Sequence, residues 1–145
     1  MFFIMESGNQ RKITSSQFGE IIVTDDLIFD FTNGILGFEH LNQFVLISDE
    51  DTEPFKWLLS IENPEIVFPL LNPWQIDINY DIGNEFNQEK DAVMVIVTLS
   101  DEDGSMSANM KAPIILDVIE QKGKQIILPS DKYSTNLIIT KKSNQ

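Results

Sequence analysis

Short β-forming segments, each ended by a turn signal, follow one another along most of this chain, and helical periodicity is nearly absent. This spacing is typical of antiparallel strands joined by tight turns. We therefore predict an all-β, mainly antiparallel fold: a small closed or partly open β-barrel, or a small sandwich, with at most one short helix. The predicted strands are residues 19–24, 27–31, 44–47, 55–61, 66–71, 92–99, 106–110, 114–119, 125–128 and 137–139.

Four segments carry more specific expectations. Residues 92–99 are apolar on both faces, so we expect a central buried strand. Pro69 would remove a ladder donor from the strand 66–71, which places that strand at a sheet edge or at a bulge. Residues 75–91 hold few apolar side chains, and we expect one short helix or an irregular crossover there. A further turn is expected at Lys122-Gly123.

Two glycines set three residues apart, Gly34 and Gly37, follow the predicted strand 27–31. Asn33-Gly34 is a strong turn signal, because both residues tolerate positive φ at little steric cost. Gly37 is expected to allow a second close backbone approach, and Phe38 is expected to fill the core. No phosphate-binding charge or catalytic side chain stands beside the glycines, so a structural role is favoured over a ligand site.

The chain has the length of a single domain, since 145 residues can bury about two-thirds of their unfolded surface. We expect one β domain over residues 14–140, an N-terminal arm at 1–13 and a polar tail at 141–145. Cysteine is absent, which excludes disulfides and thiolate metal sites and fits a reducing cytoplasm. Residues 1–5 are apolar but too short for a signal-peptide core, and no window reaches membrane-spanning length. These features predict a cytoplasmic protein without a membrane partner.

Acidic residues outnumber basic ones by 23 to 10, which gives a net charge of −13. A surface this negative repels phosphate backbones, so direct nucleic-acid binding is disfavoured. The charge either attracts a basic partner or simply keeps the protein soluble. The acids gather in two places, which we name the first acidic cluster (Asp49, Glu50, Asp51 and Glu53) and the second acidic cluster (Asp101, Glu102 and Asp103).

Patterns for catalysis or metal binding are weak. His40 is the only histidine, so a second histidine to complete a zinc site or a histidine relay is missing. No nucleophile elbow, phosphate loop or dinucleotide fingerprint occurs. Gly104 stands too early after Asp101 for an EF-hand loop, and a hairpin turn is favoured over a calcium site. We expect no enzyme activity, no cofactor and no metal; a metal-dependent or carboxylate-based enzyme is the alternative.

Aromatic and proline residues concentrate beside the first acidic cluster. Trp74 is the strongest candidate for a partner contact, because a tryptophan after Asn-Pro lies in a loop, where binding residues tend to gather. Phe55 follows the acidic cluster and is a candidate for an apolar contact. The residues that we predict to bind a partner are Asp49, Asp51, Glu53, Phe55, Trp74, Asp101, Glu102 and Asp103.

Several sequence blocks occur in a distinctive order. The main blocks are Phe18-Gly19, Phe31, Asn33-Gly34-Ile35-Leu36-Gly37-Phe38-Glu39, Asn109-Met110-Lys111-Ala112-Pro113-Ile114-Ile115 and Gly123-Lys124-Gln125-Ile126-Ile127-Leu128. Any one block is weak, but the ordered set spans residues 14–139 and is fairly specific. It resembles the signature of the flagellar assembly factor family FliW.

The resemblance implies a partner-switching regulator of flagellum biogenesis. Proteins similar to this one bind newly made flagellin in the cytoplasm. When flagellin is exported, the freed factor binds CsrA, a small basic translational repressor, and relieves the repression of flagellin synthesis. The implied partners are therefore flagellin and CsrA, and we expect the free protein to be a monomer. A flagellin chaperone without a regulatory partner is the alternative.

Overall fold

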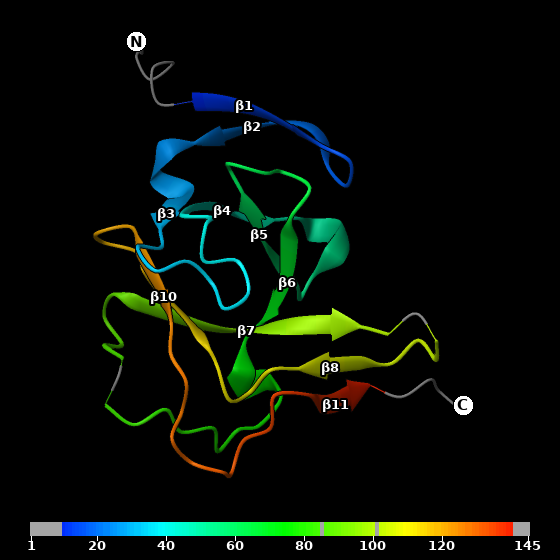
Figure 1. Cartoon of the computed structure of the whole chain (residues 1–145), viewed down its shortest axis with the longest axis vertical. Helices are drawn as coiled ribbons and strands as arrows, with labels where there is room; N and C mark the ends of the chain where they lie inside the picture. Colours follow the sequence, from blue (N-terminus) through cyan, green and yellow to red (C-terminus); the bar gives the residue numbers. More distant parts are fainter. Residues whose placement is uncertain (1–9, 85, 101, 141–145) are drawn as a thin grey trace.

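The computed structural model describes residues 10–84, 86–100 and 102–140. Within these ranges the chain forms short strands and single-turn 3-10 helices, so the all-β prediction is confirmed (Figure 1). No helix in the described part of the chain is long and apolar enough to cross a lipid bilayer. The elements are β1 (Gln10–Ser15), β2 (Gly19–Thr24), η2 (Asp25–Leu27), β3 (Ile28–Asp30), β4 (Gln43–Ser48), η3 (Glu50–Thr52), β5 (Lys56–Ser60), β6 (Val67–Leu71), η4 (Pro73–Gln75), β7 (Asp91–Leu99), β8 (Met106–Ala108), β9 (Ile114–Asp117), β10 (Lys122–Gln125) and β11 (Leu137–Thr140).

Seven of the described strands close into a β-barrel. Strands β3 to β7 form an antiparallel run in chain order, and β9 pairs with β7. Strand β10 then joins β9 to β3, where a single parallel pair, Lys122 with Asp30, closes the ring. Of the predicted alternatives, the chain therefore adopts the closed barrel (Figure 1).

Strand β7 has neighbouring strands along both edges, as predicted for residues 92–99, but it is not buried throughout, since Leu99 at its end is 59% exposed. On one side it pairs with β6. Along the other edge, its first half pairs with β9 and its second half with β8. Strand β8 also pairs with β11, so these two short strands extend the sheet beyond the barrel.

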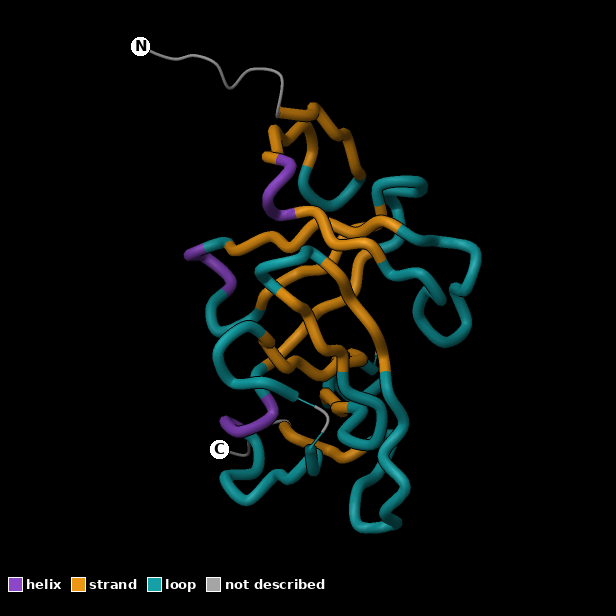
Figure 2. The backbone as a smooth tube through the Cα atoms, turned by 90° about the vertical axis from the view of Figure 1, so that its left-hand side faces the viewer, coloured by secondary structure: helices purple, strands orange, loops and turns teal. Residues whose placement is uncertain are grey.

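Side-chain alternation along the barrel strands sorts the apolar residues into three clusters. On the outer wall, the β1–β2 hairpin covers Val45 and Leu59, and Figure 2 shows this hairpin as a separate layer at the top of the molecule. The crossover after η4 and the segment after β10 cover the outer face of β7. The barrel interior holds Phe29, Phe31, Ile35, Leu41, Phe44, Leu58, Leu70, Ile114 and Leu116.

The predicted turn at Lys122-Gly123 is wrong, because both residues lie inside β10. The chain turns at residues 118–121 instead. The Asp117 carboxylate holds this turn by accepting hydrogen bonds from two backbone N–H groups, at 2.9 Å each. Glycine is needed at position 123 for packing rather than for turning, since the Phe31 ring lies against it.

Pro69 lies in β6, an interior strand with a continuous register against β5, rather than at the predicted sheet edge or bulge. Only the last two residues of β6, however, pair with β7. The hydrogen bond from the Ser60 N–H to the Ile66 C=O sets a ladder in which the Trp57–Pro69 pair is not hydrogen-bonded. The nitrogen of Pro69, which carries no hydrogen, therefore points away from β5. It points toward β7, which does not pair with β6 at this position. An interior strand tolerates the proline for this reason.

The stretch between η4 and β7 is an irregular crossover in its described residues. Ile78 is 84% exposed and Ile82 is 5% exposed, so their spacing does not mark a helical face. At the other end of the chain, β1 starts at Gln10, within the stretch expected as an arm. The tail expected at 141–145 lies outside the described residues.

Candidate functional site

An apolar groove lies between the barrel and the β8–β11 pair. Phe55 before β5, Ile76 after η4 and Met106 of β8 contribute to its walls. Leu137 and Ile138 of β11 are 40% and 54% exposed. Exposed apolar side chains gathered in a hollow are typical of protein-binding surfaces. We name this hollow of about 500 Å³ the β11 groove; its lining is Pro54, Phe55, Leu71, Gln75, Ile76, Met106, Leu137, Ile138 and Ile139.

The first acidic cluster forms the turn between β4 and β5, directly before the groove. Asp49 caps η3, because its carboxylate accepts a hydrogen bond from the Asp51 N–H at 3.0 Å. Glu53 forms an exposed ion pair with Lys56, with 3.2 Å between the charged atoms. The chain then enters the wall of the groove at Pro54. Glu53, the last carboxylate of the cluster, therefore directly precedes a wall residue of the groove along the chain.

The second acidic cluster lies in the β7–β8 hairpin turn. Asp101 lies outside the described residues, and Glu102 is exposed. The Asp103 carboxylate accepts hydrogen bonds from the Ser105 hydroxyl at 2.7 Å and the Ser105 N–H at 3.0 Å, and these bonds lower the pKa of Asp103. Strand β8 then begins at Met106, a groove residue. Both acidic clusters thus lead along the chain into the same groove.

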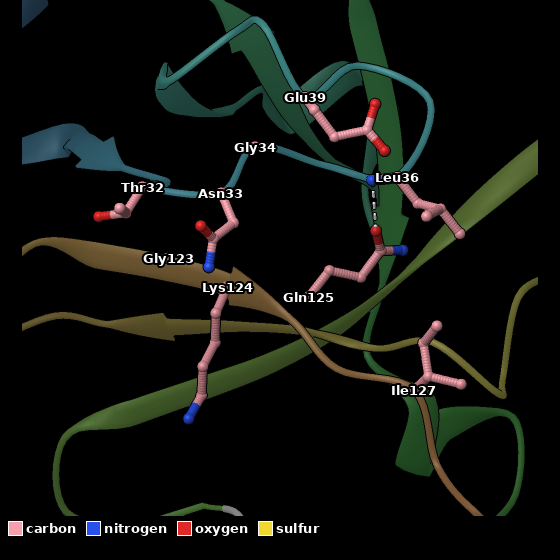
Figure 3. Close-up of a pocket in the computed structure, with 9 residues that line it drawn as sticks. All are labelled: Thr32, Asn33, Gly34, Leu36, Glu39, Gly123, Lys124, Gln125 and Ile127. Carbon is pink, nitrogen blue, oxygen red and sulfur yellow. Dashed lines mark hydrogen bonds between the residues drawn. The ribbon is translucent and has the colours of Figure 1, made fainter.

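The turn that carries the two glycines forms a second hollow, against strand β10 (Figure 3). Gly34 has a φ of +68°, and a Cβ there would lie 2.6 Å from the Cα of Glu39, so the predicted close approach is confirmed. Gly37 has a φ of +89° but open space around it, so the close approach predicted there is wrong. We name this hollow the β10 pocket; its lining is Thr32, Asn33, Gly34, Leu36, Glu39, Gly123, Lys124, Gln125 and Ile127.

Comparison with known proteins decides which family this barrel represents. The family model described as "FliW protein" matches residues 12–139. The chain belongs to the FliW family. The "Flagellar assembly factor FliW" of Thermosipho africanus is 40% identical over 129 residues, which cover 82% of this chain and 89% of that protein. The FliW of Caldanaerobacter subterraneus subsp. tengcongensis is 38% identical over 132 residues, covering 84% and 88%.

A solved FliW structure shares the fold. The chain in "Crystal structure of the flagellar assembly factor FliW" matches with a TM-score of 0.81 and 30% identity, covering 92% of this chain and 99% of that one. The family resemblance and the fold class predicted from sequence are therefore both confirmed. In this FliW chain the signature run 33–39 forms the glycine turn, and Phe38 packs edge-on against Phe68 with ring centroids 5.2 Å apart.

Trp74 of this FliW chain does not line the β11 groove. Its indole Nε1–H donates a hydrogen bond to the Tyr80 C=O at 2.9 Å. Its ring packs against Tyr80 and Phe86, with centroids 5.7 and 5.6 Å away. The exposed part of the ring borders a separate hollow that also contains Ile82 and Asp91. Trp74 therefore supports the irregular crossover.

Tyr80 is a buried titratable group that serves the fold of this FliW structure. Among the described residues, no set of three or more His, Cys, Asp or Glu side chains is gathered around a metal-sized space. Burial, with a smaller contribution from Tyr133, raises the pKa of Tyr80. The Tyr80 hydroxyl donates a hydrogen bond to the Met110 C=O at 2.6 Å. A buried phenol bonded to the main chain ties the crossover to the barrel.

The contribution of β11 to the groove is absent from the sequence-based site. Residues 137–139 are predicted from sequence only as a strand. Three successive apolar residues in a strand place at least one side chain on each face, and β11 pairs with only one neighbour in the described chain. This uncovered apolar strand is the signal that points to the groove.

Proposed function

We propose that this protein is a cytoplasmic flagellar assembly factor that binds flagellin and, once flagellin has left, binds and antagonises CsrA. The observation that carries the proposal is the FliW match over residues 12–139, together with relatives that are named flagellar assembly factors. Release of CsrA-bound flagellin message would then restore flagellin synthesis when the flagellin pool is low.

The charge of the chain supports a basic partner of this kind. A net charge of −13 attracts a positively charged RNA-binding protein and accelerates encounter, in a way that salt weakens. The carboxylates of Asp51 and Glu102 are exposed, and among the described residues neither has a basic nitrogen within 4.0 Å. Their field therefore extends into solvent, where an approaching partner meets it.

The β11 groove supplies the apolar part of the proposed contact. Phe55, Met106 and Ile138 offer apolar area that water would leave when a partner docks. Acidic turns beside an apolar hollow suit a partner segment with an apolar face and flanking lysines or arginines. Trp74 remains a proposed contact on a separate surface.

Switching requires that the two partners disfavour each other. This happens if flagellin and CsrA overlap on the surface, or if binding of one lowers the affinity for the other by a negative coupling free energy. For CsrA and RNA, the same choice exists between direct competition and allosteric antagonism. Both routes give the same regulatory direction, and a competition titration distinguishes them.

Titration of the purified full-length protein with CsrA and with flagellin tests the proposal. We expect binding to each at low salt, weaker CsrA binding at high salt, and displacement of CsrA by added flagellin. Absence of CsrA binding at low salt would reject the regulator and leave the flagellin chaperone. Absence of binding to both partners would reject both functions. A labelled flagellin leader RNA added to the CsrA titration reports whether RNA is released.

A further inference from the structure

Closure of the barrel leaves part of strand β10 without a neighbour. The only residue pair between β3 and β10 in the described chain is Asp30 with Lys122, and the Asp30 N–H bonds the Gln121 C=O at 2.9 Å. After Asp30 the chain leaves the sheet, because the turn closed by the Gly34 N–H and the Phe31 C=O carries it away. Among the described residues, the rest of β10 therefore has no hydrogen-bonded strand on this side.

The hydrogen-bonding groups of residues 123–127 follow from the pairing with β9. The Ile126 N–H bonds the Pro113 C=O and the Leu128 N–H bonds the Lys111 C=O, so even-numbered residues face β9. The N–H and C=O groups of Gln125 and Ile127 point to the opposite side. In the described part of the chain they meet no main-chain partner there. We name these groups the open edge of β10.

The open edge borders the β10 pocket, which is about 300 Å³ in volume. Figure 3 shows Asn33 extending from the glycine turn toward β10. The Leu36 N–H donates to the Gln125 Oε1 at 2.8 Å, so a side chain, rather than a strand, bridges the gap. Leu36 and Ile127 are 62% and 60% exposed and offer apolar contact beside the open edge. The pocket shares no lining residue with the β11 groove.

Charge differs between the two faces of this edge. Alternation along β10 places Gly123 and Gln125 toward the barrel interior and Lys122 and Lys124 on the outer surface. Neither lysine has a carboxylate within 4.0 Å among the described residues. Glu39 is the acidic group of the pocket, and hydrogen bonds from the Gly37 N–H and its own N–H lower its pKa.

We propose that the open edge of β10 binds an extended peptide segment of a partner protein by β-strand addition. Main-chain groups of the peptide would pair with the N–H and C=O groups of Gln125 and Ile127. The segment would alternate apolar residues, which face the barrel mouth beside Leu36, with acidic residues, which face Lys124 on the outer surface; the position beside Lys122 is held by Asp30. This is a binding activity beyond the proposed function, on a surface separate from the β11 groove.

A capped heptapeptide that alternates valine with aspartate is the probe for this site, and the same peptide with lysine in place of aspartate is its control. On titration into the isotope-labelled full-length protein, the amide resonances of Gln125 and Ile127 should shift and become protected from hydrogen exchange. Methylation of the peptide nitrogens on the edge that faces β10 should weaken binding about tenfold, because it removes two main-chain hydrogen bonds. Methylation of the nitrogens on the opposite edge should leave the affinity unchanged. The affinity of the lysine peptide should be lower by at least about fivefold.

Two protein variants complete the test. Ile127→Pro removes an N–H that bonds nothing within the described chain, so it should weaken the valine–aspartate peptide several-fold while the melting temperature stays close to wild type. Lys124→Glu should reverse the preference between the two peptides. Failure of the peptide to bind below about 1 mM, or binding insensitive to nitrogen methylation, would overturn the proposal. Protection of Gln125 and Ile127 without peptide, rising with protein concentration, would overturn it in favour of self-pairing.

Discussion

The Phe31 ring lies where a side chain at Gly123 would have to be. A Cβ on Gly123 would fall 2.7 Å from the Cδ1 of Phe31 and closer still to two further ring atoms. Phe31 is fully buried and packs edge-on against Phe44, so its ring has no room to move away. Gly123→Ala should therefore lower the free energy of unfolding by about 1–3 kcal/mol, measured by urea denaturation.

Lys124→Ala at the neighbouring exposed position is the matched control, and it should change stability by less than about 0.5 kcal/mol. Phe31→Leu in the Gly123→Ala background should recover part of the lost stability, because the smaller side chain makes room for the methyl group. A loss of stability in the double variant equal to the sum of the losses in the two single variants would show that the two residues do not interfere.

The two glycines of the signature turn should respond differently to substitution. Gly34→Ala combines a positive φ with a Cβ 2.6 Å from the Glu39 backbone, so we expect loss of at least about 3 kcal/mol or failure to fold. Gly37→Asn meets open space and only a left-handed backbone, and it should cost about 1 kcal/mol or less. Circular dichroism melts of both variants provide the measurement. A folded Gly34→Ala protein that had lost only partner binding would show that the turn is a binding site.

Trp74→Ala should destabilise the protein by about 2–4 kcal/mol, since it removes ring packing on Tyr80 and Phe86. Trp74→Phe keeps an aromatic ring but loses the bond from Nε1–H to the Tyr80 C=O, and it should cost about 1 kcal/mol. Urea denaturation measures both. A near-wild-type stability of Trp74→Ala, together with faster dissociation of a partner, would show instead that the indole acts mainly in binding.

Charge reversal in the first acidic cluster should slow CsrA association. In the triple variant Asp49→Asn, Asp51→Lys, Glu53→Lys, the asparagine keeps the cap on η3. We expect an association rate at least about fivefold lower, with a flatter salt dependence, in stopped-flow measurements. The melting temperature should change little.

A control with similar charge change separates a local from a global effect. Glu89→Lys with Asp131→Lys alters exposed acids that do not line the β11 groove and belong to neither acidic cluster. Equal slowing by this variant would mean that net charge alone steers CsrA. An unchanged rate in the triple variant would remove the first acidic cluster from the interface.

Stability should fall as pH rises above about 10 because of Tyr80. Burial raises its pKa above the ordinary value of 10.0, so the unfolded chain releases the phenolic proton before the folded protein does. The stabilisation by Tyr80 is thus fully present below the ordinary pKa of 10.0, and it is lost as the pH rises above 10.0 toward the raised pKa of the folded protein. Urea denaturation at about pH 9 and about pH 11 should show a smaller decrease for Tyr80→Phe than for wild type. Identical decreases would assign the effect to other groups.

Local patterns predict most strands of this protein, because alternation and turn residues act over a few positions. Residues 19–24 and 92–99 are examples, and the family signature adds the barrel. Closure of the barrel is different. No sequence pattern near Lys122 predicts its pairing with Asp30, because that pair depends on the arrangement of all seven strands. Gly123 shows a second limit, because a glycine required by a distant ring has the same sequence signature as a glycine required by a turn.

The candidate site also has features that the sequence predicts and features that depend on the fold. The acidic clusters are visible as charge runs, and Phe55 is visible as an aromatic residue beside one of them. The convergence of Phe55 with Met106 and Ile138 on one groove depends on how β8 and β11 extend the sheet. Trp74 follows a loop motif, but its neighbours Tyr80 and Phe86 come from an irregular segment that periodicity does not resolve.

The pair between Asp30 and Lys122 also determines when the barrel can close during translation. Strands β3 to β7 pair in the order in which a ribosome releases them, so each new strand finds its partner already made. The first strand of that series keeps an unprotected edge until β10, near the end of the chain, has emerged. Exposed strand edges are templates for aggregation. Translation through residue 125 is therefore the interval in which a nascent chain most needs protection, and a product truncated before β9 has no means of closing.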